Sequence, residues 1–176
     1  MTVNETFNNR TIVSNIPLVF EGRELSSKLQ AKLMIMRVTY DKSVSAFQEK
    51  MQEVVKGLKV EGYDNLEAEI KKMLAIEKKE DASKEELEEA KRIREEKYAD
   101  YEEKKKVLIE KVNEAYNQEG LEQTDIKVKK FTEEEYSEII SVIKTEGKIK
   151  YAMNNDESVD IPKMAFLSMI AANLVE

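Results

Sequence analysis

The chain has 176 residues, of which 37% are charged and 7% aromatic, with five glycines and two prolines, a composition that favours long helices over a compact α/β enzyme or a β-sandwich. Its formal charge of -7 argues against a dedicated nucleic-acid surface, although lysines cluster at positions 104–106 and 127–130 with acidic residues beside them. Cysteine and histidine are absent, which excludes disulfides, the common zinc sites and the Cys-His and Ser-His-Asp kinds of catalysis.

Residues 1–22 predict an N-terminal arm that ends in a short strand. The first 15 residues are rich in Asn and Thr and show no hydrophobic period, which is typical of an irregular arm. The apolar run 16–20 predicts the strand, and Pro17 places it at the start or edge of a sheet because proline cannot donate a ladder hydrogen bond. We expect this arm to contact neighbouring subunits through Ile12, Val13, Ile16, Leu18 and Phe20.

A long helix is predicted over residues 23–58. Its apolar residues recur in steps of 4-4-3, an eleven-residue repeat of about 3.67 residues per turn, which keeps them on one side of a helix. This stripe consists of Leu25, Leu29, Leu33, Met36, Tyr40, Val44, Phe47, Met51, Val54 and Leu58.

A second, shorter apolar patch lies beside the stripe on the same predicted helix. It consists of Ala31, Met34, Ile35 and Val38, which follow the spacing i, i+3, i+4, i+7 of one helix face. Either the terminal segments of the chain or another subunit must cover it. We expect intramolecular cover with a partner close by, and count Met34, Ile35 and Val38 among the partner-binding residues.

Two further helices are predicted over residues 64–79 and 83–117. Asp64 with Glu67 suggests a capped start for the first, and Ser83 with Glu86 forms a capping-box pattern for the second. Of the 35 residues from 77 to 111, 24 are charged, so we expect the early part of this helix to project into solvent and its last part to pack against helix 23–58. Residues 23–118 therefore predict a long antiparallel, coiled-coil-like helical hairpin with a charged tip.

Residues 119–176 predict the base of this hairpin. Thr132 and Glu135 form a second capping-box pattern, which predicts a short helix to about residue 143. The alternating run 148–153 and the run 159–161 predict a β-hairpin, and Pro162 suits the first turn of a final helix. The fold class is thus mainly α, with a small β element and a short C-terminal helix at the base. In that helix we expect partner contacts from Met164, Phe166, Met169 and Ile170.

Two patterns resemble metal sites, and each has a simpler interpretation. Oxygen-bearing side chains alternate from Asn154 to Asp160 as in a calcium loop, but the loop glycine is missing and Ala165 stands where a bidentate glutamate belongs, so a polar hairpin turn is favoured. The paired glutamates of 83–117 lack the histidines of a di-metal bundle site and are better explained as a solvated face. We predict no catalytic, cofactor or metal site.

The chain resembles small, mostly uncharacterised helical structural or assembly proteins of tailed bacteriophages. The resemblance is one of layout: "VFEGREL" leads into a long helix, a charged insertion follows, and "FTEEEYSEII", "GKIKY" and "VDIP" close the chain. It implies a non-enzymatic role in particle structure or assembly and transfers no functional residue.

These observations lead to two functional hypotheses. The first is a non-enzymatic virion or virion-assembly component that contacts neighbouring protein subunits through its terminal segments. The alternative is an intracellular coiled-coil adapter or regulatory binding module that acts through the long helix. Because neither a signal-peptide pattern nor an apolar run near the ~18 residues of a membrane span is visible, we expect a location in the virion or the host cytoplasm. We expect no membrane and no direct nucleic-acid partner.

Overall fold

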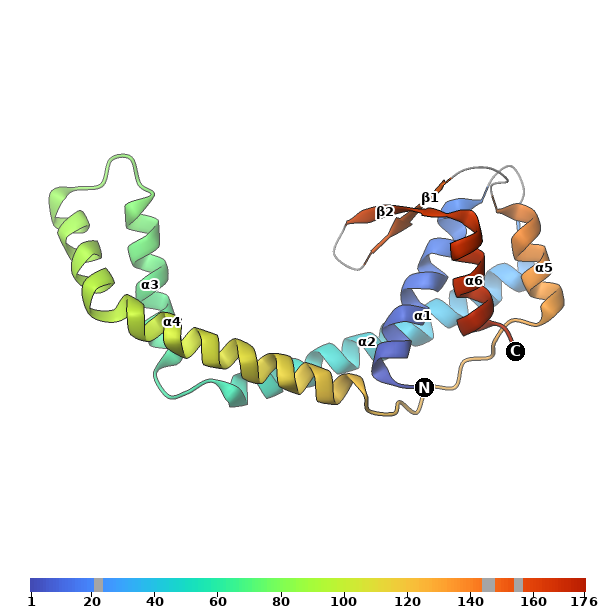
Figure 1. Ribbon diagram of the computed structural model, residues 1–176, viewed down its shortest axis with the longest axis horizontal. Helices are drawn as coiled ribbons and strands as arrows, with labels where there is room; N and C mark the ends of the chain where they lie inside the picture. The colour runs from blue at the N-terminus through green and yellow to red at the C-terminus, as the bar shows by residue number, and fades with distance from the viewer. Residues whose placement is uncertain (21–23, 144–147, 154–156) are drawn as a thin grey trace. The chain divides into compact units, whose positions relative to one another are not determined.

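The structure is a computed structural model that describes residues 1–20, 24–143, 148–153 and 157–176. The described chain is mainly helical and carries one small two-stranded sheet (Figure 1), as predicted. Its elements in chain order are α1 (Val3–Asn15), the 3₁₀ turn η1 (Ile16–Val19), α2 (Ser27–Leu58), α3 (Tyr63–Glu77), α4 (Lys84–Gly120), α5 (Glu133–Val142), β1 (Lys148–Ala152), β2 (Ser158–Pro162) and α6 (Lys163–Leu174).

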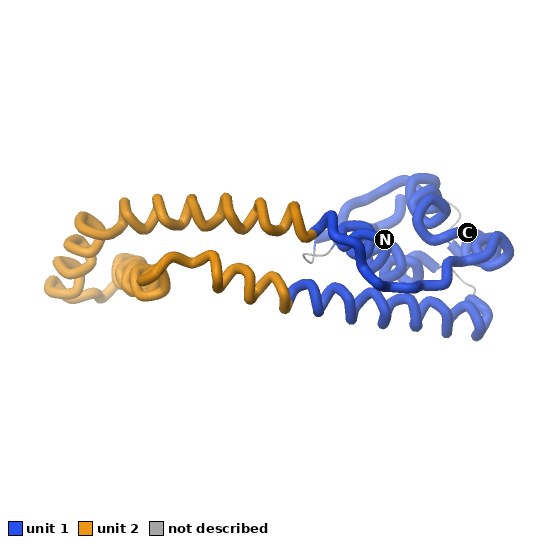
Figure 2. The backbone as a smooth tube through the Cα atoms, turned by 90° about the horizontal axis from the view of Figure 1, so that it is seen from below, with its two compact units in different colours: residues 1–48, 120–176 blue, residues 49–119 orange. Residues whose placement is uncertain are grey.

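The chain divides into two compact units, drawn in blue and orange in Figure 2. Unit 1 consists of residues Met1–Gln48 and Gly120–Glu176, and unit 2 consists of Glu49–Glu119. Helix α2 belongs mostly to unit 1 and contributes its last turns to unit 2, whereas all of α4 except Gly120 belongs to unit 2. Each unit is described by itself below.

The predicted irregular arm is wrong, because residues 3–15 form helix α1. Thr2 starts the helix with a capping box: its hydroxyl accepts a hydrogen bond from the Glu5 N–H at 3.2 Å, and the Glu5 carboxylate accepts one from the Thr2 N–H at 2.7 Å. Ile12 and Val13 at the far end of α1 are buried in the core of unit 1. The segment is therefore an integral helix rather than a free arm.

The predicted strand over residues 16–20 is also wrong. Residues Ile16–Val19 form the 3₁₀ turn η1, and only Phe20 makes an isolated antiparallel bridge, to Ile143. The Asn15 side chain donates to the Ala152 carbonyl at 2.8 Å and accepts from the Ala152 N–H at 2.7 Å. The Asn15 side-chain amide thus pairs with the backbone at the end of β1.

The predicted β-hairpin and final helix are confirmed. β1 and β2 pair antiparallel, with Lys148 opposite Pro162, and the alternation of β1 buries Ile149 and Tyr151. The turn at 154–156, and with it Asn154 and Asp156 of the calcium-loop pattern considered above, lies outside the described residues, whereas Ser158 and Asp160 of that pattern belong to β2. Helix α6 follows Pro162, and its last carbonyl, that of Leu174, accepts from the Phe131 N–H at 2.7 Å. This bond ties the end of α6 to the start of α5.

The core of unit 1 gathers side chains from both halves of the sequence. α2 contributes the first part of the predicted stripe, Leu29, Leu33, Met36 and Tyr40. The other side chains come from α1, η1, α5, β1, α6 and the residues beside them. The residues that are wholly buried include Ile16, Leu29, Met36, Tyr40, Phe131, Ile139, Phe166 and Ile170. Packing of these helices against α2 positions the surface described in the next subsection.

In unit 2, α3 and α4 pack as an antiparallel pair. Their core joins Ile70, Met73 and Ile76 of α3 to Ala90 and Ile93 of α4. Salt bridges extend the contact, among them Lys72–Glu89 at 3.1 Å and those that join Glu69 to Lys97 and Glu77 to Arg94. One face of the early part of α4 therefore packs against α3 through Ala90 and Ile93, whereas Leu87 and most of the charged residues there remain exposed. In the same unit Lys50 near the end of α2 pairs with Glu119 near the end of α4, so α2 and α4 form the predicted helical hairpin.

The helix starts of unit 2 show one correct and one incorrect capping prediction. The Ser83 box is present, with the Ser83 N–H donating to Glu86 at 2.8 Å and the Glu86 N–H donating to the Ser83 hydroxyl at 3.2 Å. α3 instead follows Gly62, which adopts a left-handed conformation with φ 77°, and among the described residues no side chain caps it. Asp64 forms a salt bridge with Lys59 at 2.6 Å rather than a cap.

Candidate protein-docking surface

Four apolar residues on one face of α2 remain exposed. They are Ala31, Met34, Ile35 and Val38, and we call them the α2 ridge. The three larger side chains are 70%, 67% and 45% exposed, respectively. The predicted intramolecular cover is therefore absent from the part of the chain that the structure describes. α2 carries apolar residues around more of its circumference than the core of unit 1 uses.

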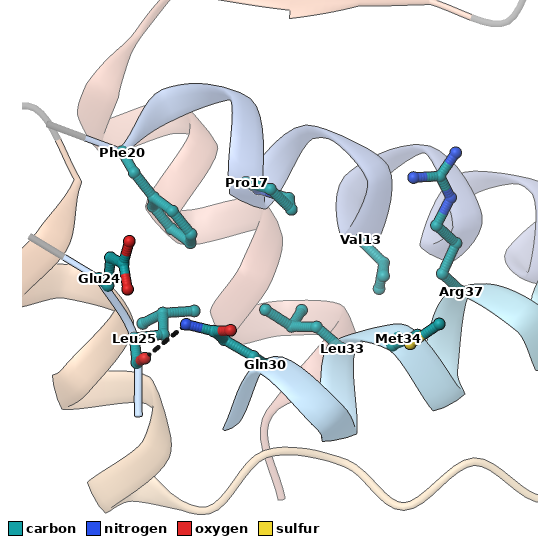
Figure 3. A pocket seen from close by; sticks show the side chains of 9 residues that line it. All are labelled: Val13, Pro17, Phe20, Glu24, Leu25, Gln30, Leu33, Met34 and Arg37. Carbon is teal, nitrogen blue, oxygen red and sulfur yellow. Dashed lines mark hydrogen bonds between the residues drawn. The ribbon is translucent and has the colours of Figure 1, made fainter. Parts of the chain in front are cut away.

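A first apolar groove runs along one side of the ridge, between α1–η1 and α2. Figure 3 shows Val13, Pro17 and Phe20 facing Leu33 across it, with Glu24 and Arg37 at opposite ends. The groove has a volume of about 400 Å³ and is also lined by Leu25, Gln30 and Met34. The Gln30 side chain donates to the Leu25 carbonyl at 2.8 Å, which fixes the amide at the entrance to α2.

A second groove of about 450 Å³ runs along the other side of the ridge. α2 forms one wall, and residues 127–129 with the start of α5 form the other. The α2 wall consists of Lys28, Ala31, Lys32, Ile35, Met36 and Thr39, and the opposite wall consists of Lys127, Val128, Lys129, Thr132 and Glu135. Ala31 and Ile35 of the ridge therefore form part of this groove, as Met34 does of the first.

An ion pair between Lys32 and Glu135 holds the two walls of the second groove together. Lys32 also donates to the Lys130 carbonyl at 2.6 Å, and its ammonium lies 5.4 Å from the centre of the Phe131 ring. Burial alone would raise the pKa of the Glu135 carboxyl, but hydrogen bonds from Lys32 and from the Thr132 N–H, with the nearby charges of Lys32 and Lys28, lower it below its ordinary value. Glu135 is therefore an ionised, structural carboxylate.

The structure separates the predicted partner-binding residues into three groups. Exposed are Leu18, Met34, Ile35, Val38 and Met164; half-buried are Phe20 and Met169; and buried in the core are Ile12, Val13, Ile16, Phe166 and Ile170. The buried five are unavailable to a partner while unit 1 is folded, because α1 and α6 pack their apolar faces inward. Of the exposed residues, only Met34, Ile35 and Val38 form a contiguous patch along one helix face.

The sequence analysis did not find the lysine rim of the second groove. Lys127 and Lys129 follow the end of α2 at Leu58 by 69 and 71 residues, and no local pattern indicates that the two segments meet. The available signal in the sequence was the alternation of apolar Ile126 and Val128 with charged Lys127 and Lys129, which is typical of an extended segment that lies on a core. In the structure the two apolar residues are half-buried and the two lysines are exposed.

No group of three or more Asp or Glu side chains in the described ranges lies close enough to hold a metal ion. Burial raises the pKa of Tyr40, Tyr63 and Tyr151, the second to about 12, and all three are core residues. No helix of the described chain is both long and apolar enough to cross a bilayer.

Comparisons with known proteins identify no relative of this chain. No family model matches the chain, and comparison with curated proteins and with solved structures finds no match. The most distinctive feature of the described surface is the α2 ridge with a groove on either side.

Proposed function

We propose that the protein is a non-catalytic interaction protein that binds another protein through the α2 ridge. The observation that carries the proposal is the exposure of Met34, Ile35 and Val38 side by side on a regular helix. Full burial of a side chain of this size gains about 1.5–3 kcal/mol. A contiguous exposed apolar patch beside grooves is characteristic of a protein-binding surface, whereas exposed apolar residues that stand singly are ordinary.

This proposal favours an adapter or binding module that acts through the long helix over one that acts through the terminal segments. The terminal helices bury Ile12 and Val13 of α1 and Phe166, Leu167, Ile170 and Leu174 of α6 in the core of unit 1, although Met164 of α6 is exposed. A virion or assembly component, as the resemblance to phage proteins implies, fits the same proposal if the neighbouring subunit contacts the ridge. The partner in either case is a protein, and a protein partner needs none of the catalytic machinery that the composition excludes.

The test is a selection of displayed random 16-residue peptides on the full-length protein. Peptides enriched on the wild type are then measured against a ridge variant, Met34→Glu with Ile35→Glu, and a matched control, Leu18→Glu with Met164→Glu. The control side chains are 66% and 70% exposed, so the two variants replace equally exposed apolar residues and change the charge equally. Circular dichroism should show unchanged helicity in both variants.

We expect the enriched peptides to bind the wild type and the control and to lose binding to the ridge variant. Peptides that bind all three proteins equally, or a selection that enriches none, would contradict the proposal. Loss of binding in the Leu18 and Met164 variant alone would instead support contacts through the terminal segments.

A further inference from the structure

We infer that the second groove binds an acidic segment of the partner protein, one that carries apolar side chains on one side and carboxylates beside them. This inference rests on the proposed function and specifies its partner. It comes from the charge of the groove rim, which differs in sign from the net charge of the chain.

The groove has an apolar floor of limited length. Met36 and Val128 form its base, and the exposed side chain of Ile35 stands beside it. Ala31, one turn before Ile35, is small enough to let a partner backbone approach α2 closely. The α2 wall extends from residue 28 to residue 39, which at 1.5 Å per residue is about 16 Å, or three helical turns. This length suits a short peptide segment rather than a flat protein face.

The rim of the groove carries a net positive charge. Lys32 and Glu135 neutralise each other in their ion pair. Lys28, Lys127 and Lys129 are exposed, and within the described chain no ion pair joins any of them to a carboxylate. The rim therefore presents three excess positive charges on a chain whose formal charge is -7.

Charges at the rim of an apolar groove act mainly by selecting partners and by accelerating their association. An apolar segment flanked by Asp or Glu would place its carboxylates against the three lysines, whereas a segment flanked by Lys or Arg would be repelled. Lys28 and the pair Lys127–Lys129 stand on opposite walls, so carboxylates on both sides of the bound segment would find a partner.

A nucleic acid or an anionic lipid surface fits this groove less well than a protein segment. Phosphates would meet the Glu135 carboxylate inside the groove and would leave the floor formed by Met36 and Val128 unused. A second copy of the chain also carries a net charge of -7 and could therefore bring carboxylates to the rim. Self-association is measured directly in the test below for this reason.

The test compares the random 16-residue peptide library on three full-length proteins. These are the wild type, a rim variant with Lys28→Glu, Lys127→Glu and Lys129→Glu, and a matched control with Lys84→Glu, Lys106→Glu and Lys148→Glu. The three control lysines are exposed and lie outside the groove, so both variants change the net charge by the same amount. Sedimentation of each protein alone reports self-association, and binding of phosphatidylglycerol vesicles reports lipid.

We expect peptides enriched on the wild type and on the control to be rich in Asp and Glu, and those enriched on the rim variant to be rich in Lys and Arg. Each acidic peptide should bind the rim variant with an affinity at least about tenfold lower than its affinity for the control. Its binding to the wild type should weaken at about 1 M salt, where charges are screened beyond ~3 Å.

The outcomes separate this inference from the proposed function. One contrary result is a set of peptides that lose binding to the Met34→Glu, Ile35→Glu variant and yet show no acidic enrichment. Another is a set of such peptides that bind the rim variant as well as they bind the control. Either result would overturn the acidic occupant and leave the ridge as a docking surface. Acidic peptides that still bind the Met34→Glu, Ile35→Glu variant would also overturn it, because they would contact the lysines without the groove. Vesicle binding or rim-dependent self-association without acidic peptides would identify a different occupant. If no peptide loses binding to the Met34→Glu, Ile35→Glu variant, the proposed function itself fails.

Discussion

The ion pair between Lys32 and Glu135 should contribute measurably to the stability of unit 1, and a double-mutant cycle tests this. Lys32→Met removes the ammonium while keeping most of the stem that packs near Phe131. Glu135→Gln removes the charge while keeping an amide that can still serve in the capping box with Thr132. The two single variants and the double variant therefore isolate the ionic contact from the packing and from the cap.

The expected magnitude follows from the burial of the pair. The two side chains are only 14% and 13% exposed, and loss of one member of a buried pair costs about 3–5 kcal/mol when the other charge is left without compensation. Here Lys32 keeps the carbonyl of Lys130 as a partner and retains some access to water. We therefore expect each single variant to lose about 1–2 kcal/mol, and the double variant to lose no more than the worse single one.

Hydrogen exchange in helix α5, measured by mass spectrometry on the full chain, reads out this stability locally. A loss of 1.4 kcal/mol should accelerate exchange about tenfold where the helix exchanges through unfolding of unit 1. A cycle on the exposed pair Lys91–Glu95 in α4, with side chains 76% and 66% exposed, is the matched control and should show no measurable coupling.

The pH dependence provides an independent check with a definite sign. The pKa of Glu135 is lowered from its ordinary value of 4.5, so its contribution is fully present above that value and is lost as the pH falls through the lowered pKa. The difference between wild type and Glu135→Gln should therefore shrink below pH 4.5 and vanish in stronger acid. Additive single effects in the cycle, or a difference that persists in acid, would refute the ionic contact.

Three other outcomes are expected from the same structure. Phe131→Ala removes a wholly buried ring from the core of unit 1 and should lower its free energy of unfolding by about 3–5 kcal/mol, measured by urea denaturation. Gly62→Ala should destabilise the start of α3 by about 1 kcal/mol, because φ is 77° there although a Cβ would meet no atom within 4 Å; exchange of the first α3 amides reports it. A hydrogen bond from Arg94 lowers the pKa of Glu77, so the protection that Glu77 gives to α3, relative to Glu77→Gln, should be present at about pH 6 and lost at about pH 2.

The elements that could be predicted from sequence are those with a strong local signal. The capping boxes at Ser83 and Thr132 were recognisable because each pairs a hydroxyl with a glutamate three residues later, at the start of an apolar period. The stripe of α2 was recognisable because its period matches one helix face, and Leu29, Leu33, Met36 and Tyr40 are indeed buried.

Helix α1 escaped prediction although it carries the same capping signal. Thr2 and Glu5 form a complete box, but polar residues, among them Thr6 and Asn9, occupy buried positions of the helix that follows. The hydrophobic period was therefore missing. Thr6 satisfies its hydroxyl by donating to the Thr2 carbonyl at 2.9 Å. Tertiary packing, rather than an apolar stripe, explains why this segment is helical.

The grooves beside the α2 ridge could not be predicted because each is made by segments that meet only in the folded chain. Residues 127–129 reach α2 through the pairing of Lys32 with Glu135 and the bond between Phe131 and Leu174, which position the start of α5. Such contacts have no local signature. The ridge itself was visible in the sequence, but whether the chain covers it was decided by where α1 and α5 pack.

The buried stripe and the exposed ridge lie on the same helix, α2, but have different physical explanations. The first part of the stripe, from Leu25 to Tyr40, is explained by the core of unit 1. That core would remain complete if Met34, Ile35 and Val38 were polar, because these side chains are exposed and contribute little burial. Folding stability therefore gives no reason for apolar residues at three adjacent positions of that face. Binding does, since a partner that covers them gains the burial that the fold leaves unused. The lysines beside the ridge then determine which partner gains it, because they favour a segment that brings carboxylates to Lys28, Lys127 and Lys129.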